Sequence, residues 1–314
     1  MQKSIKNSDV KLHRVRCVGR KRFPLAEDLI KLYSTTAPDY HHPPERETVT
    51  YIGHTRFATS SKNQVPELHP HEWTPEREEW VWSIDSRNSK FQRKLQRVCL
   101  HLTHNGDFDA MAAYGQTIVV DEIGTWLEKC LDVKNTLKGD SPKLAGCMDL
   151  LRVQGRWAAA ARLAYIRILA KSPSETPCYP WSHWLDWQEF FNDVWMFHIN
   201  NIIIVKNDVL GSSVHCGYFI NHAGEKQFVK DLVDRINLPG SIHPDVSSWS
   251  PEEIKGFVYM TVRGFLRADL YNAMSELLTR AEGSFGVQVH CTLEPGVVVI
   301  ARYAAPVFLI AIWP

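Results

Sequence analysis

Residues able to bind a small carbonyl compound stand in two short segments. Arg56 follows a β-prone run that ends at Gly53. An arginine delivered by an extended strand offers a planar fork for a carboxylate. Asn105 and Gly106 predict a tight turn, where a side-chain amide and a backbone N–H can converge on one oxyanion. The competing interpretations are a surface salt bridge for Arg56 and an ordinary turn for the pair.

Two histidines raise the question of a metal. His69 and His71 lie two residues apart, on one face of any strand, and could form a metal site with an acidic residue from elsewhere. Since no third ligand has convincing spacing, we predict no metal and no cofactor. A metallohydrolase built on these two histidines is a further interpretation, which metal analysis of the purified protein would test.

Strand signals surround these segments. Short β-prone runs at 10–18 and 48–53 predict two strands, and β-branched or aromatic runs at 80–84 and 98–103 predict two more. The charged stretch 85–97 is interpreted as a hairpin-like excursion between the second pair. Arg56 and the pair Asn105-Gly106 each follow one of these predicted strands closely.

Helix signals are stronger in the second half of the chain. The run Ser250-Pro251-Glu252-Glu253 is a capping box with proline at the first helical position, and it predicts a helix start. Paired strands are predicted at 283–289 and 296–301. Apolar residues at helical spacing predict three further helices, over 121–131, 157–171 and 269–280.

Aromatic residues gather in one stretch of the central region. A cluster of mixed spacing is more typical of a core or packing seam than of a ligand cage. Its members are Trp181, Trp184, Trp187, Phe190, Phe191, Trp195 and Phe197.

Four segments, in this order, resemble the class II glutamine amidotransferases, and most nearly the glutaminase domain of the glucosamine-6-phosphate synthase type. The resemblance covers roughly 10–140 and 267–312. The segments are Gly53-His54-Thr55-Arg56-Phe57-Ala58-Thr59, His69-Pro70-His71, Thr103-His104-Asn105-Gly106 and Glu282-Gly283-Ser284-Phe285-Gly286.

The resemblance implies an α+β Ntn-hydrolase fold, an αββα sandwich of two antiparallel sheets between helical layers. Residues 1–140 and 265–314 would form the type-2 amidotransferase domain, with the N-terminal part of the family domain missing. Residues 141–264 would form an inserted, mainly helical subdomain. Because the chain stops directly after a strand-like run, we expect it to be one part of a longer polypeptide.

The resemblance also implies roles for single residues. Arg56 would hold the α-carboxylate of L-glutamine, and Asn105 with Gly106 would form the oxyanion hole. The pocket would be shaped by Phe57 and Thr59, while His69 and His71 would be structural or line it.

Two further roles fit this sequence less directly. Aligned with the family, Val120 stands where an aspartate binds the α-ammonium group of the substrate, and Asp121 lies one residue away. The family nucleophile is an N-terminal cysteine, which Cys17 could provide only if processing exposed it. The segment 12–20 matches a later family strand better, so the chain as given is expected to be inactive.

Two functions follow from these residues. The first is a glutaminase domain that hydrolyses glutamine to glutamate and ammonia, with L-glutamine as ligand and a synthase domain or subunit as partner. The alternative is a catalytically inactive amidotransferase-like protein, a pseudoenzyme that serves in binding or as a scaffold.

Composition excludes several other classes. Thirty-six basic against thirty-five acidic residues give a net charge of +1, so no global field favours nucleic acid or an anionic membrane. Seven scattered cysteines without a paired motif indicate reduced, mostly buried thiols in a cytoplasmic compartment. The most apolar stretch, 297–313, is interrupted by Arg302 and Pro306, so we expect a soluble protein without a membrane span.

Overall fold

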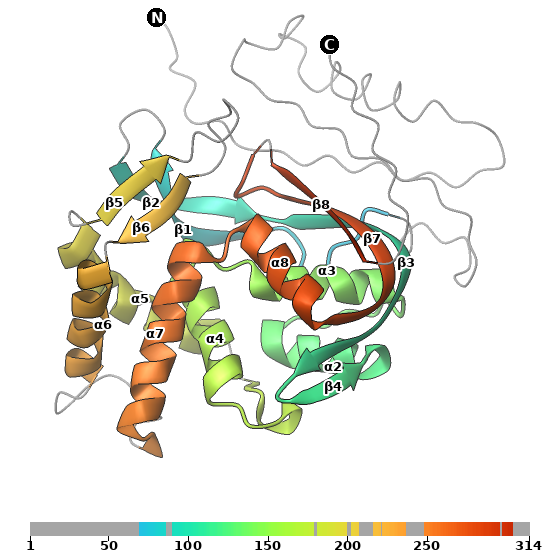
Figure 1. Ribbon diagram of the computed structural model, residues 1–314, viewed down its shortest axis with the longest axis horizontal. Coiled ribbons are helices and arrows are strands. Elements are labelled where there is room, and N and C mark those ends of the chain that lie inside the picture. Colours follow the sequence, from blue (N-terminus) through green and yellow to red (C-terminus); the bar gives the residue numbers. More distant parts are fainter. Residues whose placement is uncertain are drawn as a thin grey trace, which may run out of the picture.

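The computed structural model describes residues 69–85, 90–178, 181–199, 202–206, 216–220, 222–236, 248–295 and 297–303 (Figure 1). Within them the protein is an α+β structure whose strands all pair antiparallel, which confirms the predicted class at that level. The strands predicted at 10–18 and 48–53 lie outside the described residues.

A four-stranded antiparallel sheet positions the candidate residues. Its order is β4 (Gln116–Val119), β3 (Leu100–Ala113), β7 (Ala281–Cys291) and β8 (Val298–Tyr303). The long strand β3 runs through the middle of this sheet, and helices gather against one side of it (Figure 1). The pairing of β7 with β8 confirms the two strands predicted near the C-terminal end.

Two further ladders have two strands each. One pairs β1 (Arg77–Asp85) with β2 (Lys90–Val98), and the other pairs β5 (Ile202–Lys206) with β6 (Cys216–Ile220). The strands predicted at 80–84 and 98–103 are found with shifted ends as β1 and β3, and the hairpin-like excursion predicted over 85–97 agrees with the antiparallel pairing of β1 with β2. The full strand at 90–98 was not predicted. Its polar residues form a strand because β1 supplies a partner along its whole length; Arg93, for example, lies 5.0 Å above the ring of Trp80.

Helices make up most of the remaining described structure. They are α2 (Val120–Leu131), α3 (Asp140–Leu151), α4 (Trp157–Ile168), α5 (Trp181–His198), α6 (His222–Ile236), α7 (Pro251–Arg267), α8 (Leu270–Arg280) and a short 3-10 turn, Pro173–Glu175.

Local sequence signals set several helix ends. The Ser250 hydroxyl accepts the N–H of Glu253 at 3.2 Å, and the Glu253 carboxylate accepts the N–H of Ser250 at 2.8 Å. This capping box starts α7 as predicted, because it satisfies two N–H groups that the first turn cannot. The helices predicted over 121–131, 157–171 and 269–280 are confirmed as α2, α4 and α8, the second ending earlier.

One hydrophobic cluster joins the helices to the sheet. The ring of Trp157 stacks on Phe265 with centroids 3.4 Å apart, and Trp195 meets both rings edge-on. The same cluster reaches Leu102 on β3. The predicted aromatic core is confirmed at five of its positions, but Phe197, in the last turn of α5, is 77% exposed and does not belong to it. The side chain of Trp181 lies outside what the structure describes. The predicted division at 141–264 stays a prediction.

The predicted turn at Asn105-Gly106 is wrong. Strand β3 continues through both residues, because Asn105 pairs with Gly286 and Gly106 pairs with Phe285. The unusual backbone that glycine permits is present nevertheless, since Gly106 has φ +108°. It produces an irregularity inside a strand rather than a chain reversal.

None of the helices in the described residues combines the length and apolar character that crossing a membrane requires. Five cysteines are free: Cys178 is exposed, while Cys99, Cys130, Cys147 and Cys291 are buried. The prediction of reduced, mostly buried thiols is confirmed for these five.

Candidate functional site on strand β3

Three of the four motif segments meet on β3. The backbones of His71 and Leu102 exchange hydrogen bonds of 2.7 and 2.9 Å, and the N–H of His104 donates to Nδ1 of His69 at 3.2 Å. On the other side, Asn105 lies opposite Gly286 of β7. Segments that are far apart in the sequence therefore surround one stretch of strand.

The fourth segment cannot be placed beside them. Arg56, Phe57 and Thr59 lie outside the described residues, as does Cys17. Their predicted roles stay predictions.

Glycine is required at two positions of this site. A Cβ on Gly106 would lie 2.0 Å from the carbonyl oxygen of Ser284, and a Cβ on Gly283 would lie 2.3 Å from that of Asp107. Both glycines have positive φ values that other residues rarely adopt. Strands β3 and β7 therefore approach each other here in a way that only these two motif glycines allow.

Two backbone N–H groups on the same edge of β3 donate to side chains of other segments. The N–H of His104 meets the His69 ring, and the N–H of Phe108 donates to Oδ2 of Asp140 at 3.1 Å. In an antiparallel ladder every second residue directs its N–H to the same edge, and Gly106 lies between these two in the same alternating set. Asn105, Gly106 and Asp107 are all exposed. Three exposed residues in succession on an inner strand mark this stretch as accessible.

Asp140 is the acidic residue that the structure brings to this edge. It opens α3, where its Oδ1 accepts the N–H of Ser141 at 2.7 Å, and Nδ1 of His104 lies 3.8 Å from its Oδ2. The His104 ring also contacts the Ser141 hydroxyl at 2.9 Å. Because the Asp140 side chain is 31% exposed, a ligand can still reach it.

Asp121 has a different environment. Its side chain is 97% exposed on α2, and its carboxylate lies 3.9 Å from Nζ of Lys143. Sequence reasoning selected Asp121 and missed Asp140. The signal that could have found Asp140 is the run Gly139-Asp140-Ser141-Pro142, an acidic residue and a proline at a helix start.

The two predicted histidines are buried beside β3. Their rings meet edge-on with centroids 4.4 Å apart, and Nδ1 of His69 accepts a hydrogen bond from the N–H of His104. This fits the structural or pocket-lining role implied by the resemblance. Within the described residues, the group whose ligand atoms converge is a different one, consisting of Glu72, Cys99 and His101.

Four charged residues form an ion network, and a fifth, the buried Arg162, lies close enough to interact electrostatically with each of them. Nε and Nη2 of Arg156 donate to both carboxylate oxygens of Glu79, at 2.7 and 2.9 Å, and Arg77 donates to Asp149 at 3.1 Å. Burial opposes ionisation of Glu79, but the guanidinium groups of Arg156 and Arg77 hold the pKa of its carboxyl at about 2. The network joins β1, α3 and the start of α4, so it is interpreted as structural.

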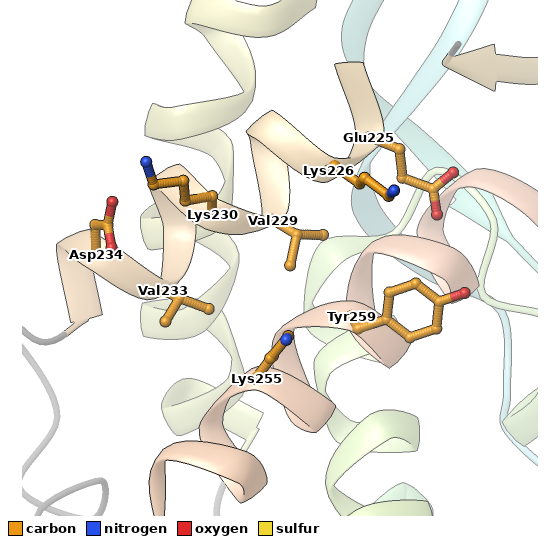
Figure 2. Close-up of a pocket in the computed structure, with 8 residues that line it drawn as sticks. All are labelled: Glu225, Lys226, Val229, Lys230, Val233, Asp234, Lys255 and Tyr259. Atoms are coloured by element: carbon orange, nitrogen blue, oxygen red, sulfur yellow. The ribbon is translucent and has the colours of Figure 1, made fainter. Parts of the chain in front are cut away.

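A groove of about 470 Å³ lies between α6 and α7, on a different part of the molecule from β3 (Figures 1 and 2). Three lysines, Lys226, Lys230 and Lys255, stand around a wall formed by Val229 and Val233. Acidic side chains line it as well, so its charge favours no single class of ligand.

Comparison of the chain with protein-family models, with curated proteins and with solved structures found no match. The resemblance to class II amidotransferases therefore stays a prediction that rests on the four short segments alone.

Proposed function

We propose that this chain is a class II glutamine amidotransferase-like domain of the Ntn-hydrolase type, which binds L-glutamine beside β3. The observation that supports this most is the meeting of three separate motif segments around Gly106. His69 caps the N–H of His104, while Gly286 and Phe285 pair with Asn105 and Gly106. Hydrolysis to glutamate and ammonia would follow where a cysteine nucleophile is supplied.

The amide carbonyl of the ligand is assigned to the exposed stretch of β3. Asn105 contributes a side-chain amide and Gly106 a backbone N–H, and both residues are accessible to solvent. Two fixed N–H donors are what an oxyanion requires, because they stabilise the charge as it develops. The close approach of β3 to β7 fixes the backbone of both residues in place.

The α-ammonium group of the ligand is assigned to Asp140. Each of its carboxylate oxygens accepts a backbone N–H, from Phe108 and from Ser141. A carboxylate has about four lone-pair sites, so acceptor capacity remains for a cationic ligand. On this geometry Asp140 replaces Asp121 in the role that the resemblance implied.

None of the four buried cysteines that the structure describes is suited to act as the nucleophile. Burial raises the pKa values of the thiols of Cys130, Cys147 and Cys291, and burial together with Glu72 raises that of Cys99. A thiol held protonated is a poor nucleophile. This favours a second candidate function, an amidotransferase-like protein that binds glutamine without hydrolysing it.

Calorimetric titration with L-glutamine tests the proposed site. We expect the wild-type chain to bind, and Asp140→Asn to weaken binding by about tenfold or more, since charged hydrogen bonds contribute roughly 1.5–3 kcal/mol. Asn keeps an acceptor for the N–H of Phe108, which protects the fold. Asp109→Asn, an exposed change on the same strand, is the matched control and should bind normally.

A glutamate-release assay on the same samples separates the two functions. Release that Cys17→Ala abolishes would assign the nucleophile to Cys17, whereas binding without release would support the pseudoenzyme. If wild-type protein does not bind glutamine at all, the proposed function is wrong.

A further inference from the structure

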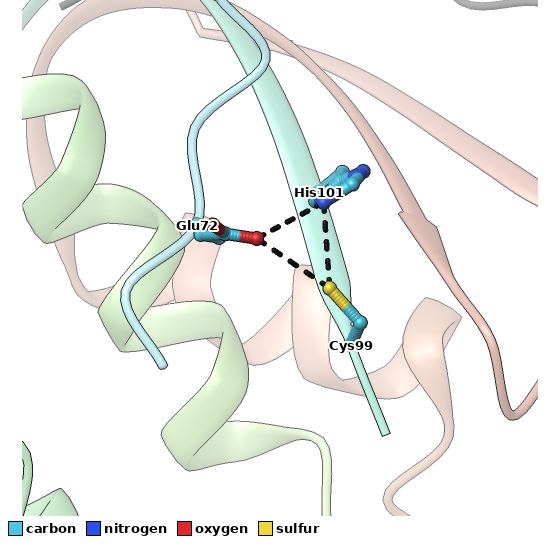
Figure 3. A group of neighbouring side chains, drawn as sticks. All are labelled: Glu72, Cys99 and His101. Atoms are coloured by element: carbon cyan, nitrogen blue, oxygen red, sulfur yellow. Dashed lines mark hydrogen bonds and ion pairs between the residues drawn. The ribbon is translucent and has the colours of Figure 1, made fainter. Parts of the chain in front are cut away.

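Three side chains of different chemistry converge at the start of β3. Sγ of Cys99 lies 3.3 Å from Nε2 of His101 and 3.6 Å from Oε2 of Glu72, and Nε2 of His101 lies 3.1 Å from the same carboxylate oxygen (Figure 3). Cys99 and His101 are two residues apart, so an extended backbone directs both to one face. Glu72 reaches them from the neighbouring segment.

The backbone on both sides of this trio is fixed. Glu72 directly follows His71, which is bound to Leu102 by two hydrogen bonds. Cys99 donates its N–H to the hydroxyl of Thr292 at 3.0 Å and accepts the N–H of Thr292 at 3.1 Å. The three side chains are therefore brought together by the sheet and not by a mobile loop of their own.

The arrangement does not fit a nucleophile–base–acid relay. In such a relay the cysteine contacts one ring nitrogen of the histidine, and the acid orients the ring through the other. Here both Cys99 and Glu72 approach Nε2 of His101. Three atoms that carry lone pairs thus surround a single point.

The distances fit a tetrahedral metal ion. With Zn–S of about 2.3 Å, and Zn–N and Zn–O of about 2.0–2.1 Å, tetrahedral angles put S about 3.5–3.6 Å from both N and O, and N about 3.3 Å from O. The observed separations are 3.3, 3.1 and 3.6 Å. A zinc ion can therefore enter with adjustments of only a few tenths of an ångström.

We propose that Glu72, Cys99 and His101 form a binding site for Zn²⁺, with a water molecule at the fourth position. Sulfur and imidazole donors favour zinc over magnesium or calcium, which prefer oxygen ligands alone. As the Zn–S bond forms, the thiol proton of Cys99 passes to solvent. One thiolate and one carboxylate then balance the two positive charges of the ion.

Access to the site comes from its partly open side. Cys99 is buried, whereas the side chains of His101 and Glu72 are 12% and 23% exposed. An ion can therefore enter past Glu72, which makes Glu72→Gln the most informative variant: it keeps the size of the side chain and removes the charged ligand.

Zinc competition with a chromophoric chelator tests this proposal on the full chain. We expect one zinc per chain, and Glu72→Gln to weaken binding by at least about tenfold, since even outer partners of zinc ligands matter by 10–100-fold. Cys178→Ser removes the exposed thiol and is the matched control, so it should bind like the wild type. Thermal melts of the metal-free proteins check that each variant is folded.

Cobalt(II) substitution supplies an independent readout. A cobalt ion bound by Cys99 and His101 in tetrahedral geometry gives a thiolate charge-transfer band and strong visible absorption, and both should disappear in Cys99→Ser. Failure of the wild type to bind zinc would overturn the proposal. So would zinc binding that survives Glu72→Gln but is lost in Cys178→Ser.

Discussion

Two clusters of titratable side chains differ in how their charges are balanced. In the network of Arg77, Glu79, Asp149 and Arg156, two cations face two anions, and each has an opposite partner within hydrogen-bonding distance. In the trio of Glu72, Cys99 and His101, each converging atom offers a lone pair, and the trio contains no permanent cation.

The difference teaches how to separate structural clusters from clusters that bind a ligand. Burial does not distinguish them, because Glu79 and Cys99 are both buried. The kinds of charge that each cluster contains do distinguish them. A network in which each carboxylate already has a guanidinium partner stabilises the fold, whereas converging donors of electron pairs are satisfied best by a cation.

The largest expected effect belongs to the ion network. Arg156→Met should lower the free energy of unfolding by about 3–5 kcal/mol, because it leaves Glu79 buried without its bidentate partner. Urea denaturation at neutral pH measures this loss. The double variant Glu79→Gln/Arg156→Met should recover part of it, and a loss below about 1 kcal/mol in the single variant would show that Arg77 alone suffices.

The stability of the protein at acidic pH should depend on the same network. The pKa of Glu79 is lowered from its usual value of 4.5 to about 2 in the folded protein. Its contribution to stability is therefore fully present above pH 4.5 and is lost as the pH falls towards 2. The loss should be on the order of 3 kcal/mol.

Urea denaturation across this acidic range measures the effect, and Glu79→Gln is the control. The variant should show a flatter dependence of stability on pH, because its amide does not titrate. Parallel curves for the two proteins would mean that Glu79 is not the titrating group.

Zinc binding at the trio should raise the free energy of unfolding of the protein by a smaller amount. At a free zinc concentration about a hundredfold above Kd, the wild-type chain should gain about 2.7 kcal/mol. Without zinc, Glu72→Gln should change stability by less than about 1 kcal/mol, because the side chain is partly exposed. Differential scanning calorimetry with and without zinc measures both, and equal zinc stabilisation of variant and wild type would contradict the assignment.

The smallest expected effect concerns independence of the two sites on β3. Asp140 contacts Phe108 and lies 3.8 Å from Nδ1 of His104, which is three residues or about 10 Å along the strand from His101. Asp140→Asn should therefore change zinc affinity by less than about twofold. The converse control is Glu72→Gln, which should bind glutamine normally, and a loss of both ligands in either variant would show that the two regions act as one.

The sequence predicted those features that depend on neighbouring residues. The capping box at Ser250 and the periodicity of 121–131 act within a few residues, so they specify their helices locally. The hairpin over 85–97 was expected, but the full strand at 90–98 was not, because its partner β1, and not its own polar sequence, makes it a strand. The turn at Asn105 was predicted for a similar reason, since pairing with β7 overrides the local preference.

The candidate sites depend on long-range pairing even more strongly. Asp140 was missed because only the packing of α3 against β3 brings it to Phe108. Glu72 was missed because the bridge between His71 and Leu102 is needed to place it beside Cys99 and His101. The sequence did indicate the right neighbourhood, since His71 was itself a candidate metal ligand.

A crystal structure of the chain with bound L-glutamine would test the proposed function most directly. We predict that the α-ammonium group lies within hydrogen-bonding distance of the Asp140 carboxylate, and that the amide oxygen faces the N–H of Gly106 and the side chain of Asn105. Glutamine bound elsewhere, or crystals that show no glutamine at saturating concentration, would contradict the assignment of this stretch of β3 as an amidotransferase site.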